Sequence, residues 1–389
     1  MPDELPYLMR TYAPPALGFV RGEGAYLYDR RGRRYLDFIS GLGVNLLGHC
    51  PPAVVRAIRA QAGRLLHASN LYRIDQQVQL AQRLCEASFG ERAFFCNSGG
   101  EATDTMIKIA RRYAWLRGQW QRTRVLAFEG AFHGRTYGAL SATARRAARE
   151  GFGPVVPGIA FAPFNDLAAA AARVDARTCL VLVEPVLGEG GIVPGTRAFL
   201  EGLRRLCDAH GALLAFDEVQ SGLGRTGRRF AYEHFGVVPD LMSLGKGLAG
   251  GLPMAAVVAR GEAAAALTPG THGSTFGGNP LSSAAALVVT RTVFRERFLR
   301  QVTDRGAFLL RQLEECLAGR PRVRAVRGLG LMVGIELDAS SAPYVERCRD
   351  RGLLVSGAAE TVLRLLPPLI VTRRQCEAAA AILAAALEG

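Results

Sequence analysis

The stretch Leu213–Pro253, LLAFDEVQSGLGRTGRRFAYEHFGVVPDLMSLGKGLAGGLP, contains two short apolar runs that both end in charged residues. The run at 212–216 ends in Asp217 and Glu218, and the run at 241–244 ends in glycine-flanked Lys246. Short, uniformly apolar runs are typical of buried strands. Because open α/β sheets bind ligands beyond the carboxyl ends of their strands, these charged side chains are candidates for one site.

The scarcity of lysine narrows the choice of a nucleophilic amine. Lysine and arginine together number 48, but only Lys108 and Lys246 are lysines, which leaves 46 arginines. Arginine cannot replace lysine as a nucleophile because it stays protonated. Lys108 lies in a helical run and is most simply a solvated helix lysine. Lys246 lies where a planar ligand can approach the backbone, and it could attach covalently to an aldehyde cofactor; the alternative is a surface turn lysine.

The composition, 49% hydrophobic and 21% charged, is that of an ordinary globular protein. The length of 389 residues is enough for more than one lobe. We find no apolar run near the ~18 residues of a membrane span and no signal-peptide core. The eight cysteines and six histidines show no CxxC or HxxxH spacing, so we expect reduced thiols, no metal site and a cytoplasmic protein.

The net charge of +14 raises the question of an acidic partner. The arginines are spread along the whole chain, and we see no basic run interleaved with aromatic residues. We therefore expect no nucleic-acid partner, although a functional basic patch stays open as an alternative to a compositional bias.

From about residue 91, strand-like and helix-like segments alternate. Such alternation predicts an α/β domain with a mostly parallel sheet covered by helices. The expected strands are 93–96, 124–128, 159–162, 180–183, 212–216, 241–244 and 254–259, and the expected helices lie near 100–118, 166–173 and 197–210.

The two chain ends look different from this central part. A hairpin of Ala25–Tyr28 and Arg34–Phe38 begins the chain, and short strands with two helices follow Arg320. Neither end has enough apolar surface to fold alone, so we expect both to pack as one smaller lobe. The predicted division is 1–62 for the N-terminal part of the small domain, 63–278 for the large domain, 279–319 for a long connecting helix, with or without a break, and 320–389 for the C-terminal small domain.

Of two glycine motifs, one indicates a ligand site and the other does not. Ser98, Gly99 and Gly100 follow an apolar run and open a helix, an arrangement that favours a bound phosphate; a plain serine cap is the alternative. The GxGxxG match at 222–227 neither directly follows its strand nor opens an amphipathic helix, so it does not indicate a dinucleotide site.

The segment 132–136, FHGRT, combines an aromatic ring, a guanidinium and a hydroxyl in one loop. Such a loop could stack on a ligand ring and pair with a carboxylate. Asp217 could keep a heterocyclic nitrogen protonated, although a strand-end salt bridge explains Asp217 and Glu218 equally well.

Taken together, these motifs resemble the class III aminotransferases, which use pyridoxal 5′-phosphate (PLP). The resemblance covers nearly the whole chain. It implies the PLP-dependent transferase fold (fold type I), with a seven-stranded mostly parallel sheet and a smaller α+β domain made from both chain ends. The segments that carry it are LLAFDEVQSGLGRTG, DLMSLGKGLAGGLP, AFHGRTYGALS and HGSTFGGNPL. The front segments GEGAYLYDRRGRRYLDFISGLGVNLLGH and LLHASNLY resemble the acetylornithine subgroup.

The resemblance implies roles for the residues around the cofactor. Lys246 would attach to the PLP aldehyde and move protons, and Asp217 would hold the pyridine N–H. The other expected cofactor contacts are the phosphate cradle Ser98, Gly99 and Gly100, the ring contacts Phe132, His133, Val219 and Gln220, and Thr275, which would reach the phosphate in the neighbouring subunit. The site would then need a homodimer.

The resemblance also implies substrate contacts. Arg135 and Arg364 would bind carboxylates, Glu189 would mask Arg364 while the amino donor is bound, and Ser274 would lie near the partner's substrate. Gly41 stands where the similar ornithine aminotransferases have tyrosine, which leaves room for an acylated amine. Thr103-Asp104 departs from the family's commoner Asn-Glu, which weakens the subgroup assignment more than the cofactor assignment.

The resemblance thus implies transfer of the terminal amine of N2-acetyl-L-ornithine to 2-oxoglutarate, in arginine biosynthesis. Three alternatives within the class stay open: an aminoadipate-semialdehyde enzyme of lysine biosynthesis with an acidic carrier protein, an ornithine or γ-aminobutyrate enzyme, and an ω-amine transaminase. Outside the class, a non-enzymatic protein that binds nucleic acid is the remaining alternative.

Overall fold

The structure is a computed structural model that describes residues 7–13 and 15–388. Within these residues, seven strands form the central sheet in the order β4-β12-β11-β10-β7-β5-β6. Strand β12 is antiparallel to both neighbours, and the other pairs are parallel. The predicted α/β fold with a mostly parallel seven-stranded sheet is confirmed. The strands are β4 (Arg92–Cys96), β5 (Arg124–Phe128), β6 (Ile159–Ala162), β7 (Thr178–Val183), β10 (Leu213–Asp217), β11 (Leu241–Leu244) and β12 (Ala255–Ala259).

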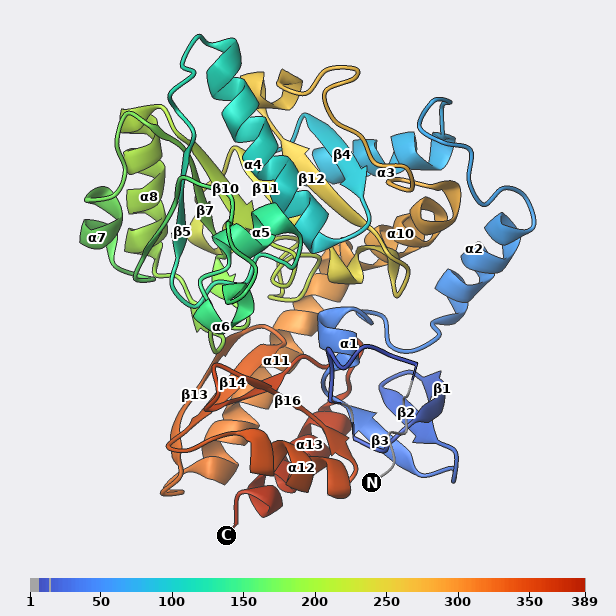
Figure 1. Ribbon diagram of the computed structural model, residues 1–389. Coiled ribbons are helices and arrows are strands. Elements are labelled where there is room, and N and C mark those ends of the chain that lie inside the picture. The colour runs from blue at the N-terminus through green and yellow to red at the C-terminus, as the bar shows by residue number, and fades with distance from the viewer. Residues whose placement is uncertain (1–6, 14, 389) are drawn as a thin grey trace.

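Helices cover both faces of this sheet (Figure 1). Helix α4 (Gly99–Leu116) packs on one face, and α7 (Leu167–Ala171) and α8 (Arg197–His210) pack on the other. In β7, Leu180 and Leu182 point to the α4 face, whereas Val181 and Val183 point to the α8 face. Because both faces are buried, the strands read as continuous apolar runs rather than as alternating ones.

Further short helices and strands precede α10 (Pro280–Val293) in the chain, and α2 and α3 pack against α10. They are α1 (Ser40–Gly43), α2 (Pro52–Ala62), α3 (Asp75–Glu86), α5 (Tyr137–Ala142), α6 (Arg146–Arg149), α9 (Tyr232–Phe235), β8 (Val186–Leu187) and β9 (Val193–Pro194). None of the described helices is long and apolar enough to cross a membrane.

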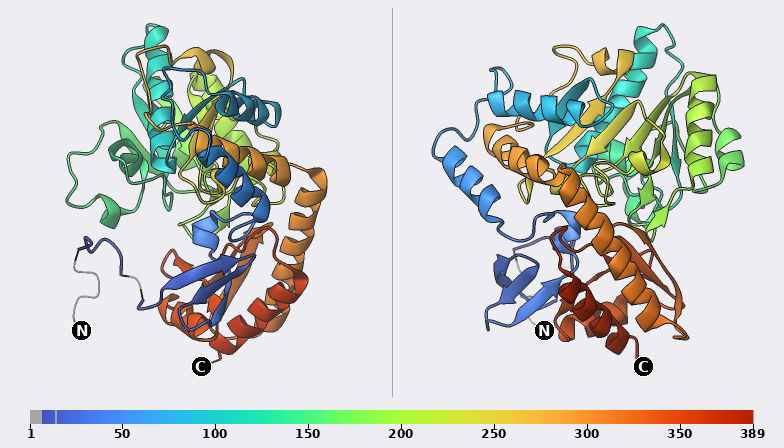
Figure 2. Two further views of the ribbon diagram at one scale, coloured as in Figure 1. Left: turned by 90° about the vertical axis from the view of Figure 1, so that its right-hand side faces the viewer. Right: turned by 180° about the vertical axis from the view of Figure 1, so that it is seen from behind.

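The segment expected as a connecting helix consists of two helices. Helix α10 (Pro280–Val293) is capped by Asn279, whose side chain accepts from the Ser282 N–H at 2.9 Å. Helix α11 (Glu296–Leu317) starts after Arg295, which has an extended backbone. Together they run from the central sheet to the second lobe, as Figure 2 shows from behind.

The two chain ends lie side by side (Figure 1). The expected front hairpin has an additional strand: β1 (Phe19–Glu23) precedes β2 (Tyr26–Asp29) and β3 (Arg34–Asp37). Strand β15 (Leu353–Leu354), from the other end of the chain, pairs parallel with β3. The remaining C-terminal elements are β13 (Val323–Leu329), β14 (Met332–Leu337), α12 (Ala342–Asp350), β16 (Ser356–Ala358), β17 (Val362–Leu365) and α13 (Arg373–Ala386).

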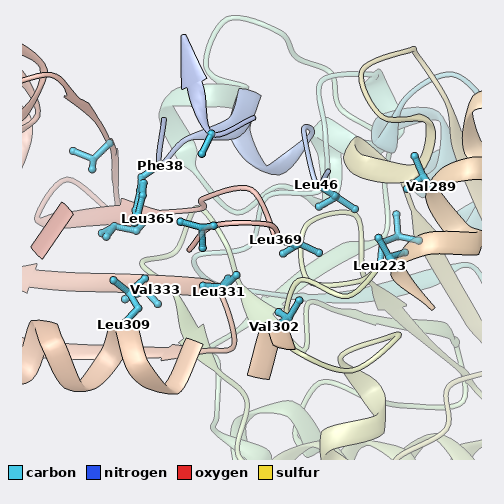
Figure 3. Close-up of a cluster of buried hydrophobic side chains, with 14 of the residues drawn as sticks. Phe38, Leu46, Leu223, Val289, Val302, Leu309, Leu331, Val333, Leu365 and Leu369 are labelled. Carbon is cyan, nitrogen blue, oxygen red and sulfur yellow. The ribbon is translucent and has the colours of Figure 1, made fainter. Parts of the chain in front are cut away.

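A hydrophobic cluster joins these ends to the rest of the chain (Figure 3). Phe38 from the front end, Leu365 from β17 and Leu309 from α11 are all fully buried in it. The cluster extends through Leu369 to Leu223, which follows β10. This packing fixes β17 relative to the carboxyl end of β10, where the candidate site lies.

Candidate active site

A cavity of about 160 Å³ lies at the carboxyl ends of β10 and β11. Asp217 is the last residue of β10, and Lys246 follows β11 by two residues. Asp217 pairs with Ser243 in the register of these parallel strands. The cavity is lined by Gly99, Gly100, Phe132, His133, Gly134, Glu184, Glu189, Asp217, Val219, Gln220 and Lys246.

Lys246 is held in an unusual backbone conformation by two glycines. Its φ is +43°, and Gly245 precedes it with an extended φ of −168°. A Cβ on Gly247 would lie 2.4 Å from Leu46, so that position has no room for a side chain. Burial, followed by the charge of Arg364, lowers the pKa of Lys246 to about 8, against the opposing carboxylates of the cavity. A larger share of this amine is therefore neutral and nucleophilic than for an exposed lysine.

Asp217 accepts three hydrogen bonds that fix both of its oxygens. Oδ2 accepts from His133 Nδ1 at 2.7 Å, and Oδ1 accepts from Ser243 Oγ and from the Val219 N–H, both at 3.0 Å. Burial acts to lower the pKa of His133, but the hydrogen bond to Asp217 and the negative charges of Asp217 and Glu184 together outweigh it and raise that pKa. Among the described residues, Nε2 of His133 is buried without a partner.

The helix that follows β4 begins at two glycines against the cavity. Ser98 caps helix α4 by accepting from the Glu101 N–H at 3.3 Å. A Cβ on Gly99 would lie 2.9 Å from Val219, and one on Gly100 would lie 3.2 Å from Thr136 Oγ1. The first N–H groups of a helix have no partner within it, so this end forms a cradle for an anion.

Phe132 and Gln220 face the same cavity. The Phe132 N–H donates to Glu184 Oε1 at 2.9 Å, and the Arg135 guanidinium lies 5.3 Å from the Phe132 ring centroid. Within the described part of the chain, Gln220 Oε1 is buried without a hydrogen-bond partner. A buried acceptor without a partner is costly unless a ligand or water supplies a donor.

Arg364 and Glu189 form an ion pair at the cavity. Arg364 Nη1 donates to Glu189 Oε1, and Arg364 Nε donates to Ser356 Oγ at 3.2 Å. The Arg364 side chain is 3% exposed, whereas that of Glu189 is 34% exposed. The carboxylate therefore covers a buried guanidinium and can move toward solvent.

The other predicted site residues do not line the cavity. They are Ser98, which caps α4, the exposed Arg135, the residues Gly41, Ser274 and Thr275, and Arg364, which contacts the cavity residue Glu189. Ser274 Oγ accepts from Asn97 Nδ2 at 3.2 Å, so its loop lies beside the start of α4, and Thr275 is exposed on that loop. Gly41 is exposed in a turn that Ser40 ties to the Leu366 carbonyl.

Two cavity residues, Glu184 and Gly134, were not among the predicted site residues. Glu184 accepts from the Phe132 and Gly188 N–H groups, each at 2.9 Å, and burial raises its pKa. It directly follows the apolar run 180–183, the same strand-end signal that indicated Asp217. A Cβ on Gly134, which has a φ of +134°, would lie 2.6 Å from the Gly100 Cα. Only the folded chain shows that contact.

Residues 7–387 match the family model described as aminotransferase class-III. The chain belongs to the class III aminotransferases. A curated acetylornithine aminotransferase of Caldanaerobacter subterraneus is 45% identical over 381 residues, covering 98% of this chain and 97% of the relative. The acetylornithine aminotransferase of Methanocaldococcus jannaschii is 43% identical over 377 residues, covering 96% and 94%.

Solved structures of class III aminotransferases superpose on the whole fold. The ornithine aminotransferase from Toxoplasma gondii has a TM-score of 0.94 and is 32% identical, covering 98% of this chain and 92% of that chain. The N-acetylornithine aminotransferase from Stenotrophomonas maltophilia has a TM-score of 0.85 and is 33% identical, covering 96% of each chain.

Class III aminotransferases depend on PLP, and the cavity residues fit this cofactor. The glycine cradle at the start of α4 suits a phosphate, and the buried Lys246 suits an aldehyde. Gln220 Oε1 needs a donor such as a ring hydroxyl, and Asp217 can accept from a protonated ring nitrogen. These residues would bind the phosphate, the aldehyde and the ring of PLP within one cavity.

Proposed function

We propose that this protein transfers the terminal amino group of N2-acetyl-L-ornithine to 2-oxoglutarate, which yields N-acetyl-L-glutamate 5-semialdehyde and L-glutamate. The geometric observation that carries the aminotransferase chemistry is that Lys246 and Asp217 share one buried cavity. The choice of amino donor is supported by the relatives named acetylornithine aminotransferase, at 43–46% identity. We propose arginine biosynthesis as the pathway, and the cytoplasm as the location, which the eight free cysteines support.

When bound, PLP supplies an aldehyde that takes up the amino group and a ring that accepts electrons. Lys246 would present its partly neutral amine to that aldehyde, and its Nζ would hold and move the proton at the carbon that carries the substrate amine. Asp217, held by His133 and Ser243, keeps the ring nitrogen protonated. Because this carboxylate is buried and accepts three hydrogen bonds, it needs no reorganisation during the reaction.

Arg364 and Glu189 would distinguish the two substrates. The ion pair stays closed while the amino donor is bound, because Glu189 neutralises the buried guanidinium. A dicarboxylate such as 2-oxoglutarate displaces Glu189, which is partly exposed, and binds Arg364 in its place. Arg135, which lies over Phe132, would bind the other carboxylate.

Gly41 supports an acylated donor over free ornithine. Its φ is +64°, and a Cβ there would lie 3.3 Å from Asn45 Nδ2. Glycine adopts this φ without strain, and it places no side chain where the similar ornithine aminotransferases have tyrosine. We propose that the absence of a side chain at Gly41 leaves room for the acetyl group of the donor.

We propose a homodimer in which each subunit completes the other's site. The segment 65–72 exposes Leu65, Leu66, Leu71 and Tyr72, at 47%, 56%, 86% and 72%. Phe276 is 59% exposed, and its ring lies 5.3 Å from that of His67. Exposed apolar side chains that gather over two neighbouring segments are typical of an interface. Thr275, next to Phe276, would then reach the partner's cofactor phosphate, and Ser274 its substrate.

The substitution Lys246→Ala tests the assignment, because no other lysine lies in the cavity. We expect the visible absorbance of the bound cofactor to disappear and kcat to fall by about 10³-fold or more. The overall fold should persist, which circular dichroism checks. Retained turnover with acetylornithine and 2-oxoglutarate would refute the role of Lys246.

The net charge of +14 favours one alternative, an aminoadipate-semialdehyde substrate linked to an acidic carrier protein. Rates on that substrate would fall steeply between low and high salt, whereas rates on free acetylornithine would not. Steady-state rates on acetylornithine, ornithine, N-succinyl-diaminopimelate and γ-aminobutyrate separate the remaining donors. The proposal requires acetylornithine to give the highest kcat/KM of these.

A further inference from the structure

Lys108, the second lysine of the chain, has a specific partner in the structure. Its Nζ lies 2.7 Å from His272 Nδ1, although the two residues are 164 positions apart. On the other side of the ring, His272 Nε2 lies 2.9 Å from Thr105 Oγ1. The hydroxyl of Thr105 donates in turn to the Glu101 carbonyl at 2.8 Å. Helix α4 therefore holds the His272 ring from both sides.

The direction of these hydrogen bonds follows from the donors available. The Lys108 ammonium can only donate, so His272 Nδ1 must accept. The single Thr105 hydroxyl proton goes to the Glu101 carbonyl, so Thr105 Oγ1 accepts from His272 Nε2. Neutral His272 with its proton on Nε2 satisfies every contact. A protonated His272 would point a second N–H at the ammonium and remove the acceptor that Lys108 uses.

His272 lies in the segment 266–279 that precedes α10, at the start of the stretch 272–277, here called the 272–277 loop, which carries Ser274 and Thr275. The later part of the loop has its own anchors, because Asn70 Nδ2 donates to the Ser274 carbonyl at 3.0 Å and to the Gly277 carbonyl at 2.9 Å. Farther back in the segment, Arg112 of α4 donates to the Ala266 carbonyl at 3.1 Å, and His272 ties the start of the 272–277 loop to α4. The same helix begins at the glycine cradle, so this contact sets the loop relative to the phosphate site.

We propose that Lys108 and His272 are positioning residues, which together form a latch that holds the 272–277 loop on helix α4 while His272 is neutral and releases its first part when His272 takes up a proton. The proposal deepens the proposed function, because the loop is the segment that would complete the partner's site.

The electrostatic surroundings agree with the geometry. Burial and then the charge of Lys108 lower the pKa of His272, against the carboxylate of Glu101 on the same helix. From β4, the ring of Phe94 packs on His272 at a centroid distance of 4.8 Å. Since the pKa lies below its usual range, the neutral form holds at pH 7 and above. It is lost as the pH falls through that lowered pKa.

Hydrogen–deuterium exchange of the 271–277 amides between pH 5 and 8, corrected for the intrinsic rate, tests the latch in the purified protein with and without PLP. Exchange should rise as the pH falls below the pKa of His272, by up to about tenfold per pH unit for opening linked to one proton. In Lys108→Met, this stepwise rise in exchange should occur at a pH about half a unit higher than in the wild type. The reason is that this variant loses an exposed positive charge that repels the imidazolium. Lys108→Arg, which keeps the charge, should leave the step within about a quarter of a unit of the wild type.

His272→Asn keeps an acceptor for Lys108 and cannot titrate, so exchange should not depend on pH. The matched control is Arg117→Met, which removes a cation from the end of the same helix, where Arg117 pairs with Glu262 at 2.5 Å. This control should leave the step unmoved. Flat exchange in the wild type, or a step that Lys108→Met does not move, would overturn the latch.

The exchange measurement does not depend on turnover, so it separates the two proposals. A pH step in a protein that neither binds PLP nor transaminates would sustain the latch and overturn the proposed function. A protein that transaminates but whose loop exchange does not depend on pH would sustain the proposed function and overturn the latch.

Discussion

Hydrogen bonds from neighbouring groups fix the orientation of the Asp217 carboxylate. His133 holds one oxygen, Ser243 and the Val219 N–H hold the other, and the group is 4% exposed. Thr103 extends this support, since its hydroxyl donates to the His133 carbonyl at 2.9 Å. Thr103, which departs from the family pattern, therefore supports the candidate site through His133.

Glu189→Gln tests the exchange of partners at Arg364. Without the carboxylate, 2-oxoglutarate no longer competes with a negative charge for the guanidinium, so we expect its KM to fall about tenfold. The KM for acetylornithine should rise by a similar factor, because Arg364 stays charged and uncovered beside it. Both values come from steady-state kinetics.

The matched control is Glu336→Gln, which removes the carboxylate of another Arg–Glu pair, that between Arg327 and Glu336. It should leave both KM values nearly unchanged. Parallel changes of the two KM values in Glu189→Gln would contradict the masking role.

Helix α4 combines several tasks along its length. Its first turn forms the glycine cradle, its middle packs on the central sheet through Met106 and Ala110, and Lys108 holds the 272–277 loop. These tasks are compatible because the buried residues and Lys108 lie on different faces of the helix. A shift of α4 would therefore disturb cradle and loop together.

Gly134→Ala should disturb the cradle through α4. The new Cβ would lie 2.6 Å from the Gly100 backbone, and a φ of +134° is strained for alanine. We expect PLP to bind about 5- to 150-fold more weakly, from a strain of about 1–3 kcal/mol. Titration of the apo protein with PLP, followed by absorbance, measures this.

Gly118→Ala separates backbone strain from the clash, since Gly118 also has positive φ, +71°, but nothing lies within 4 Å of the added Cβ. This control should lose some thermal stability and keep its PLP affinity. Equal affinity losses in both variants would contradict the cradle argument.

At the level of the whole molecule, both chain ends meet the centre in one hydrophobic cluster (Figure 3). Arg364 reaches Glu189, 175 positions earlier, because Leu365 beside it is buried in that cluster. The exposed apolar residues of 65–72 and Phe276 are left outside this core. We propose that a second copy covers them.

Leu71→Glu tests the dimer without disturbing the core, since Leu71 is 86% exposed. A charge buried in the interface should raise the dimer dissociation constant by about 30-fold or more, and PLP should be retained less well. Analytical ultracentrifugation measures the association. The control is Trp120→Glu, because Trp120 is 71% exposed but lies outside the proposed interface. This variant should dimerise as tightly as the wild type. An unchanged Leu71→Glu dimer would contradict the proposed interface.

Local patterns in the sequence were sufficient to predict the seven strands of the central sheet, the carboxylate at the end of β10 and the position of Lys246 just after β11. These features depend on residues that are neighbours along the chain, whose burial leaves a continuous apolar run. The short β1, β8 and β9 carry no such run, so they were not predicted.

Contacts between distant segments required the folded chain. The pairing of β15 with β3 and the hydrogen bond between Lys108 and His272 each join residues more than 150 positions apart. The contact of Arg364 with Glu189 spans a similar distance, and only the family resemblance, not a local pattern, predicted it. A local pattern reports which side of a segment is buried, but the packing of the whole core selects its neighbour. For this reason Lys108, read from its helix as a solvated lysine, gained a partner only when the 272–277 loop was placed beside it.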